Sequence, residues 1–147
     1  MVQGKQRLAQ FLVYSGALPF IASVCASLMG WEIFDARWYG ISYGAIILSF
    51  LAGIHWGVYL FASSSCPQNL FITSNIAALL GWLSLLVYPH WVAFFLLILC
   101  FSWMLLLDHK LFRLDILPGW FYRLRVHATI IVIASLLSLG LFNGLAA

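Results

Sequence analysis

The sequence predicts an all-α membrane protein, a polytopic bundle of five transmembrane helices forming one domain over residues 1–147. Composition is the first reason: 65% of the residues are hydrophobic and 7% are charged, against about 25% charged in an ordinary soluble domain. The second is five apolar runs, each close to the roughly 20 residues that a membrane-spanning helix needs. The third is a bias of basic residues toward alternate links between these runs. Together these exclude a soluble domain, and the few scattered cations argue against nucleic-acid binding.

Short polar links separate the five apolar runs. The first run contains Pro19, and its length and the further runs after it indicate a retained span, not a cleaved signal peptide. Pro67 and Pro89 break the chain between later runs. The segment 108–122 mixes apolar with charged residues, so we expect it to lie at the membrane interface. The predicted spans are 8–30, 40–61, 70–88, 91–107 and 123–142.

The basic residues predict the orientation of the bundle. The N-terminus, the 62–69 link and the 108–125 segment fall on one side with six of the seven Lys and Arg residues, and the other side has only Arg37. Because cytoplasmic loops are enriched in Lys and Arg, the N-terminus is predicted to be cytoplasmic and the C-terminus periplasmic or extracellular. This is the pattern of a multi-pass membrane protein. We expect Arg123 and Arg125 to contact headgroups of the lipid bilayer.

The second span carries small or polar residues on two faces, which predicts a central helix with neighbours on both sides. Gly53 and Gly57 form a pair of small residues one turn apart, and Ser49 lies one turn before them. Such residues allow the backbones of two helices to approach closely. We therefore expect Ser49, Gly53 and Gly57 to lie in a helix–helix contact.

His55 is an ionisable residue inside the second span, roughly 10 Å from its cytoplasmic end at 1.5 Å per residue. At that depth it should face protein, water or a ligand. Asp108 is the expected counter-charge of Arg123 or Arg125, and a partner of His55 through water. A packing role, with His55 bonded to a backbone carbonyl or to Asn75, is an equally weighted alternative. The residues predicted to form a ligand site in the cytoplasmic half are His55, Trp56, Asn75, Trp103, Asp108 and His127.

These residues favour a non-enzymatic bundle that binds a small apolar ligand, such as a quinone, a porphyrin or a lipid, with Trp56 and Trp103 as walls. An alternative is an accessory or assembly subunit of a larger, respiratory membrane complex, or a homo-oligomer. A transporter, or a haem protein that uses His55 and His127, is a weaker alternative. The sequence has no nucleophile–base pair, metal-binding motif or phosphate loop. We therefore predict no catalytic residue and no metal site, and the sequence identifies no cofactor.

Three motifs carry a resemblance to a known family. They are YSGALPF at 14–20, YGAIILSFLAGIHWG at 43–57 and PGWFYRLR at 118–125. In these motifs the chain resembles the membrane proteins that have the domain of unknown function 3429, a family that includes the animal transmembrane protein 69. The resemblance extends over the whole chain and is most specific at 43–57. It implies a compact five-helix bacterial membrane protein and supplies no activity.

Overall fold

The apolar runs fold into α-helices. The structure is a computed structural model, and it describes residues 2–31 and 35–141. Within these residues it has no strand, and its five α-helices confirm the predicted all-α fold. The elements are α1 (Val2–Leu28), α2 (Ala36–Ala62), the short 3-10 helix η1 (Ser63–Ser65), α3 (Leu70–Leu86), α4 (Val92–Arg113) and α5 (Gly119–Leu141).

Four of these helices, α1, α2, α4 and α5, are long and apolar enough to cross a membrane. The helix α3 has 17 residues, which corresponds to about 25 Å at 1.5 Å per residue. That length is at the lower limit for a spanning helix. Four helices therefore meet the length and hydropathy expected of a membrane span. That α3 crosses the membrane as a fifth span stays a prediction.

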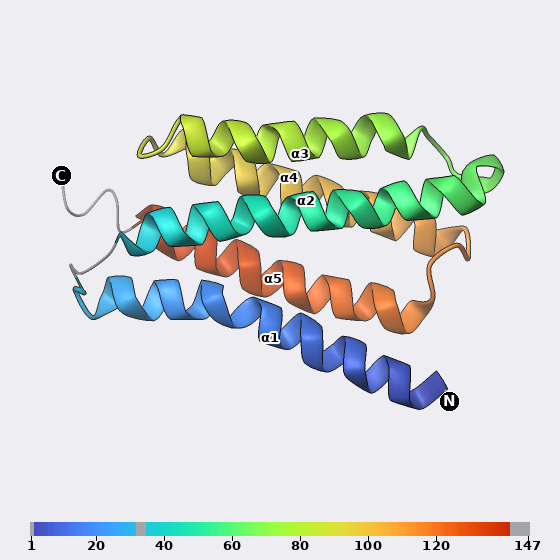
Figure 1. The fold of residues 1–147 in the computed structure, drawn as a ribbon, viewed down its shortest axis with the longest axis horizontal. Coiled ribbons are helices and arrows are strands. Elements are labelled where there is room, and N and C mark those ends of the chain that lie inside the picture. The colour runs from blue at the N-terminus through green and yellow to red at the C-terminus, as the bar shows by residue number, and fades with distance from the viewer. Residues whose placement is uncertain (1, 32–34, 142–147) are drawn as a thin grey trace.

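Consecutive helices run in opposite directions along one common axis (Figure 1). The start of α1, the link after α2 and the link between α4 and α5 lie at the same end of the bundle (Figure 1). We call this the basic end, because the segments that meet there hold six of the seven Lys and Arg residues. The arrangement is the one that the charge bias requires, and the side of the membrane that the basic end faces stays a prediction.

The helix α2 is the centre of the bundle, as predicted, since it contacts each of the other four helices. Its inward face follows the spacing of an amphipathic helix, with buried residues at alternating steps of four and three. This stripe consists of Ile41, Ala45, Leu48, Ala52 and His55. His55 is therefore in phase with the core of the bundle.

Two glycines allow close helix contacts in this core. A Cβ atom at Gly44 of α2 would lie 3.0 Å from the Cδ1 atom of Leu97 on α4. A Cβ atom at Gly81 of α3 would lie 3.0 Å from the Cδ2 atom of Leu48 on α2. Leucine side chains of neighbouring helices thus occupy the space that a larger residue would need.

The expected helix contact at Ser49, Gly53 and Gly57 is wrong for the described chain. A Cβ atom at Gly53 or Gly57 would meet nothing within 4 Å. Ser49 is exposed, and its hydroxyl donates to the carbonyl of Ala45 in its own helix. The pattern correctly shows small residues on two faces, but the other helices pack on only one of these faces.

The predicted interfacial segment 108–122 is divided between the end of α4, a short link and the start of α5. The helix α4 continues to Arg113 and α5 begins at Gly119, so only five residues link them. Asp108 and Leu111 are buried because they continue the inward stripe of α4. The charged residues of this segment had suggested a position at the membrane interface, but one of them, Asp108, is buried inside the bundle.

At the opposite end of the bundle, Asp35 caps α2. Its Oδ1 atom accepts hydrogen bonds from the backbone N–H groups of Arg37 at 3.0 Å and Trp38 at 3.1 Å, and its Oδ2 atom accepts one from the hydroxyl of Tyr88. Partial burial of the Asp35 carboxyl opposes its ionisation, but the bonds from Tyr88, Trp38 and Arg37 outweigh that effect and lower its pKa from 3.8.

The Asp35→Asn variant is expected to be less stable than the wild type at neutral pH, because asparagine keeps a capping oxygen but loses the charge that these donors stabilise. The folded-state pKa of Asp35 is lowered, so its contribution is complete above the unfolded pKa of about 4 and is lost as the pH falls through the folded value. The difference in melting temperature between the two proteins should therefore shrink below about pH 4. Thermal unfolding followed by circular dichroism in detergent measures it. A difference that stays constant on acidification would contradict the assignment.

Candidate functional site

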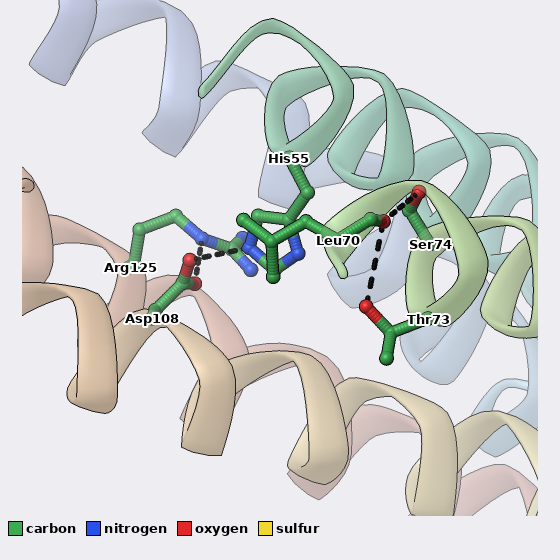
Figure 2. A network of polar contacts seen from close by, with 6 residues as sticks. All are labelled: His55, Leu70, Thr73, Ser74, Asp108 and Arg125. Atoms are coloured by element: carbon green, nitrogen blue, oxygen red, sulfur yellow. Dashed lines mark hydrogen bonds and ion pairs between the residues drawn. The ribbon is translucent and has the colours of Figure 1, made fainter. Parts of the chain in front are cut away.

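Three polar side chains from three helices meet inside the bundle: His55 of α2, Asp108 of α4 and Arg125 of α5 (Figure 2). The Nε2 atom of His55 lies 2.8 Å from Oδ1 of Asp108, and Nε of Arg125 donates to Oδ2 of Asp108 at 2.8 Å. The three residues are only 1%, 1% and 6% exposed. We call these three residues the interior network. Each oxygen of the Asp108 carboxyl thus has its own donor.

Helical periodicity brings the three residues together. Each of them continues a stripe of buried residues that repeats at steps of three and four, and such residues share one face of a helix. The stripe on α4 is Leu97, Phe101, Met104, Asp108 and Leu111. The stripe on α5 is Arg125, Thr129, Val132, Leu136 and Leu139. Because all three stripes face the core, their polar members meet at one level near the basic end.

The charges of the interior network balance. The guanidinium of Arg125 keeps its positive charge in proteins, and the Asp108 carboxylate beside it is the counter-charge. A protonated imidazole at His55 would add a second positive charge to a buried site, which is costly. We therefore assign His55 as neutral, with its proton on Nε2 donated to Asp108, so that Nδ1 is a hydrogen-bond acceptor.

Three buried atoms around the interior network lack a hydrogen-bond partner in the described part of the chain: His55 Nδ1, Arg125 Nη2 and Thr129 Oγ1. Thr129 is four residues after Arg125 and therefore lies on the same face of α5. Other buried hydroxyls of the bundle do have partners, as at Ser74, whose hydroxyl donates to the carbonyl of Leu70 (Figure 2). Unpaired buried polar groups are rare in native proteins, so these three atoms are the chemically distinctive feature of the bundle.

Among the other predicted site residues, Trp56 and Asn75 do not line the interior network. Trp56 is 41% exposed, and its ring lies against that of Phe71 with centroids 4.4 Å apart. Asn75 is exposed, and its amide donates to the carbonyl of Phe71. Trp103 is half-buried against the core of the bundle. Of the six predicted site residues, the structure brings only His55 and Asp108 together, and they bond directly, not through the predicted water.

His127 and Arg125 also depart from their predicted places. His127 is exposed, and its Nδ1 atom lies 3.1 Å from the hydroxyl of Tyr14 on α1. It lies two residues after Arg125 and thus on nearly the opposite face of α5. The pair of haem ligands predicted from His55 and His127 is therefore not formed. Arg125 was expected to contact lipid headgroups, but it is buried against Asp108, whereas Arg123 is exposed.

The sequence offered Arg123 and Arg125 as possible counter-charges of Asp108, and the structure assigns this role to Arg125. The hydroxyl of Thr129 was missed at the level of sequence. The signal was present in the spacing of α5, because Arg125 and Thr129 are in phase with the apolar residues Val132 and Leu136. Arg123 is out of phase with this stripe. Extending the stripe toward the start of the helix would have separated the buried arginine from the exposed one.

An apolar groove of about 670 Å³ lies between α1 and α2, at the end of the bundle opposite the basic end. Three of its lining side chains donate to backbone carbonyls of α1 and α2: Ser23 to Pro19, Ser42 to Tyr39, and Tyr43 to Gly16. The full lining is Pro19, Ala22, Ser23, Ala26, Trp31, Tyr39, Ser42, Tyr43 and Ile46. None of the predicted site residues belongs to it.

Comparisons with known proteins give a family and no reaction. The model of a family described as "Protein of unknown function (DUF3429)" matches residues 5–141. A protein named Transmembrane protein 69 from Xenopus tropicalis is 31% identical over 131 residues, which is 87% of this chain and 51% of that protein. The Transmembrane protein 69 of Mus musculus is 26% identical over 129 residues, 86% of this chain and 53% of that protein. The chain thus spans about half the length of these relatives. No solved structure gives a significant match.

Proposed function

The chain belongs to the DUF3429 family of proteins of unknown function, and we propose that this membrane protein is a non-enzymatic bundle that binds a small, mostly apolar molecule at the interior network. The observation that carries the proposal is the set of unpaired atoms: His55 Nδ1, Arg125 Nη2 and Thr129 Oγ1 are buried and lack partners in the described residues. We further propose that it lies in the inner membrane with its basic end toward the cytoplasm, because six of its seven Lys and Arg residues gather at that end.

A purely structural role explains the interior network less well. An ion pair that only joins helices needs Asp108 and Arg125, and each additional buried polar atom without a partner costs about 1–3 kcal/mol. Two such atoms belong to the interior network, and the third, Thr129 Oγ1, lies one turn farther along α5. A bound molecule that pairs with them offsets this cost, and the same pairing gives the site its selectivity.

The geometry favours a quinone or a lipid over a porphyrin. The Nε2 atom of His55 is bonded to Asp108 at 2.8 Å, so only Nδ1 of this residue could bind a porphyrin metal. His127, the second axial ligand in the haem hypothesis, faces Tyr14 on the exposed side of α5. The unpaired atoms of Arg125 and Thr129 can form hydrogen bonds to ligand oxygen atoms, as in a quinone or a lipid headgroup. A porphyrin held by a metal–histidine bond would not need them.

Native mass spectrometry of the protein extracted gently from its own membranes tests the proposal. The wild type is expected to carry a molecule of reproducible mass, and His55→Phe should retain about ten-fold less of it, which corresponds to the loss of one hydrogen bond of about 1.4 kcal/mol. His127→Phe is the matched control, because it removes an exposed histidine from the same end of the bundle. No bound molecule, or equal retention by all three proteins, would reject the proposal.

A second candidate function is that of an accessory or assembly subunit of a larger membrane complex. It is favoured by the open face of α2, where a Cβ atom at Gly53 or Gly57 would meet nothing within 4 Å. Small residues of this kind allow a helix of another protein, or of a second copy, to approach closely. The same mass measurement addresses it, because a strictly monomeric species from native membranes would count against this function.

A further inference from the structure

We infer that the molecule bound at the interior network has a headgroup with both an O–H donor and an acceptor oxygen, attached to an apolar tail. A hydroquinone and a protonated carboxylic acid both have this chemistry. The inference rests on the proposed ligand-binding function and narrows its ligand to one chemical class. It is carried by the hydrogen-bonding capacities of the three unpaired atoms and by the charge balance around Asp108.

The His55 side of the site requires a donor from the ligand. The Nε2–H group of the imidazole is used by Oδ1 of Asp108 at 2.8 Å. In a neutral imidazole the other nitrogen has a lone pair and no proton. That nitrogen, Nδ1, is buried and lacks a partner in the described chain. A hydroxyl group of the ligand satisfies it, whereas an ester or an ether does not.

The Arg125 side of the site requires an acceptor from the ligand. A guanidinium group only donates hydrogen bonds, and Nη2 of Arg125 is buried and unpaired while Nε is bonded to Asp108 at 2.8 Å. An oxygen of the ligand accepts this N–H. The hydroxyl of Thr129, one turn along the same face of α5, both donates and accepts, so it can bond to either oxygen of the headgroup.

Charge balance restricts the headgroup further. Arg125 and Asp108 neutralise each other, so a neutral headgroup leaves the buried site neutral as a whole. A carboxylic acid meets this condition with its proton on its own oxygen or shared with Nδ1 of His55, since the total charge is the same in both cases. A phosphate or sulfate headgroup would bring an uncompensated negative charge into the bundle, which is costly.

The surroundings select an apolar tail. Leu51 and Ala52 are buried in the turn before His55 on α2, and Leu107 and Leu111 are buried on either side of Asp108 on α4. No polar side chain other than those of the interior network is buried in these turns of α2 and α4. A sugar or another polyhydroxyl molecule would leave several of its groups without partners there.

Two matched pairs of probes test the headgroup on the purified full-length protein in detergent. The first pair is lauric acid and methyl laurate, and the second is decylhydroquinone and its dimethyl ether; each pair differs in its O–H groups and keeps the same tail. Equilibrium dialysis gives the affinities, and ¹⁵N NMR of histidine-labelled protein follows Nδ1 of His55. We expect at least one O–H probe to bind about ten-fold or more tightly than its capped partner and to shift the Nδ1 signal. The acid identifies a lipid-derived source, and the hydroquinone identifies a quinol.

Variants link that preference to the site. His55→Phe should abolish the preference for the O–H probe, and His127→Phe should keep it. Thr129→Val keeps the shape of the side chain and removes the hydroxyl, so the affinity for the O–H probe should fall by about three- to ten-fold. This variant tests the site even if His55→Phe does not fold. Equal binding of free and capped probes would overturn the headgroup inference while leaving the proposed function standing. If none of the four probes binds but a bound molecule is still seen in the protein from native membranes, only the headgroup inference is overturned. If no probe binds and no molecule is seen in the protein from native membranes, the headgroup inference and the proposed function are both overturned.

Discussion

Replacing Asp108 with asparagine is expected to destabilise the protein by about 3–5 kcal/mol, because it removes the counter-charge of a buried arginine. Arg125 is 6% exposed, and its Nε atom donates to Asp108 at 2.8 Å. Asparagine keeps the shape of the side chain but not its charge, so the guanidinium would remain buried and uncompensated. Unfolding in mixed detergent micelles, followed by circular dichroism, measures the free energy.

A matched control and a double variant separate the loss of the counter-charge from other causes. Asp115→Asn makes the same chemical change at an exposed residue at the same end of the bundle and should alter the free energy of unfolding by less than about 0.5 kcal/mol. Combining Asp108→Asn with Arg125→Gln removes both charges and should restore much of the stability. The electrostatic explanation fails if the double variant is no more stable than Asp108→Asn alone.

The second large effect is expected at Gly44, where valine should destabilise the bundle by about 1–3 kcal/mol through overpacking. A Cβ atom at this position would lie 3.0 Å from Cδ1 of Leu97 and 3.6 Å from Cε1 of Phe20. Leu97 and Phe20 are both fully buried, so neither side chain has free space into which it can move. The same unfolding measurement in mixed micelles reports the difference.

Gly53→Ala is the control for this prediction, and its expected effect has the opposite sign. A Cβ atom at Gly53 would meet nothing within 4 Å, and alanine is favoured over glycine inside a helix by about 0.5–1 kcal/mol. The variant should therefore be as stable as the wild type or slightly more stable. A loss of stability as large as that of Gly44→Val would mean that Gly53 packs against a neighbour, as the sequence had predicted.

The fold was predictable because lipid as a solvent leaves a strong and simple pattern in the sequence. The apolar runs predicted five helices, which the structure confirms. The central position of α2 is also confirmed, but the contacts on both of its faces, from which that position was inferred, are not formed. The same pattern did not tell which face of α2 packs against the other helices. The close contact was predicted at Gly53 and Gly57, whereas the structure places it at Gly44, since the choice between two faces depends on where the other helices lie.

The candidate site was predictable in part. His55 stood out because an ionisable residue is costly inside a membrane, and Asp108 was named as its partner. Arg125 was named both as a possible counter-charge of Asp108 and as a contact of lipid headgroups, because charge near an interface is usually solvated. This reasoning does not consider helical phase. Arg123 and Arg125 are two residues apart and thus on nearly opposite faces of α5. Only the arrangement of α2, α4 and α5 decides which arginine meets Asp108.

The interior network gives the bundle a polar contact between helices that are far apart in sequence. His55 and Asp108 are separated by 53 residues, and Asp108 and Arg125 by 17. Such a contact both fixes the register of α2, α4 and α5 and provides directed hydrogen-bonding atoms inside an apolar bundle. The structural and the ligand-binding roles of these residues are therefore compatible, and separate readouts of stability and of binding distinguish them.

An experimental structure of the protein extracted from its native membranes, at a resolution that shows side chains, tests the proposed site most directly. We predict density for a small molecule within hydrogen-bonding distance of both His55 Nδ1 and Arg125 Nη2, with Asp108 bonded to the other side of each group. Density for a single water, or apolar side chains packed against these two atoms, would contradict the proposal and leave the interior network as a contact that only joins helices.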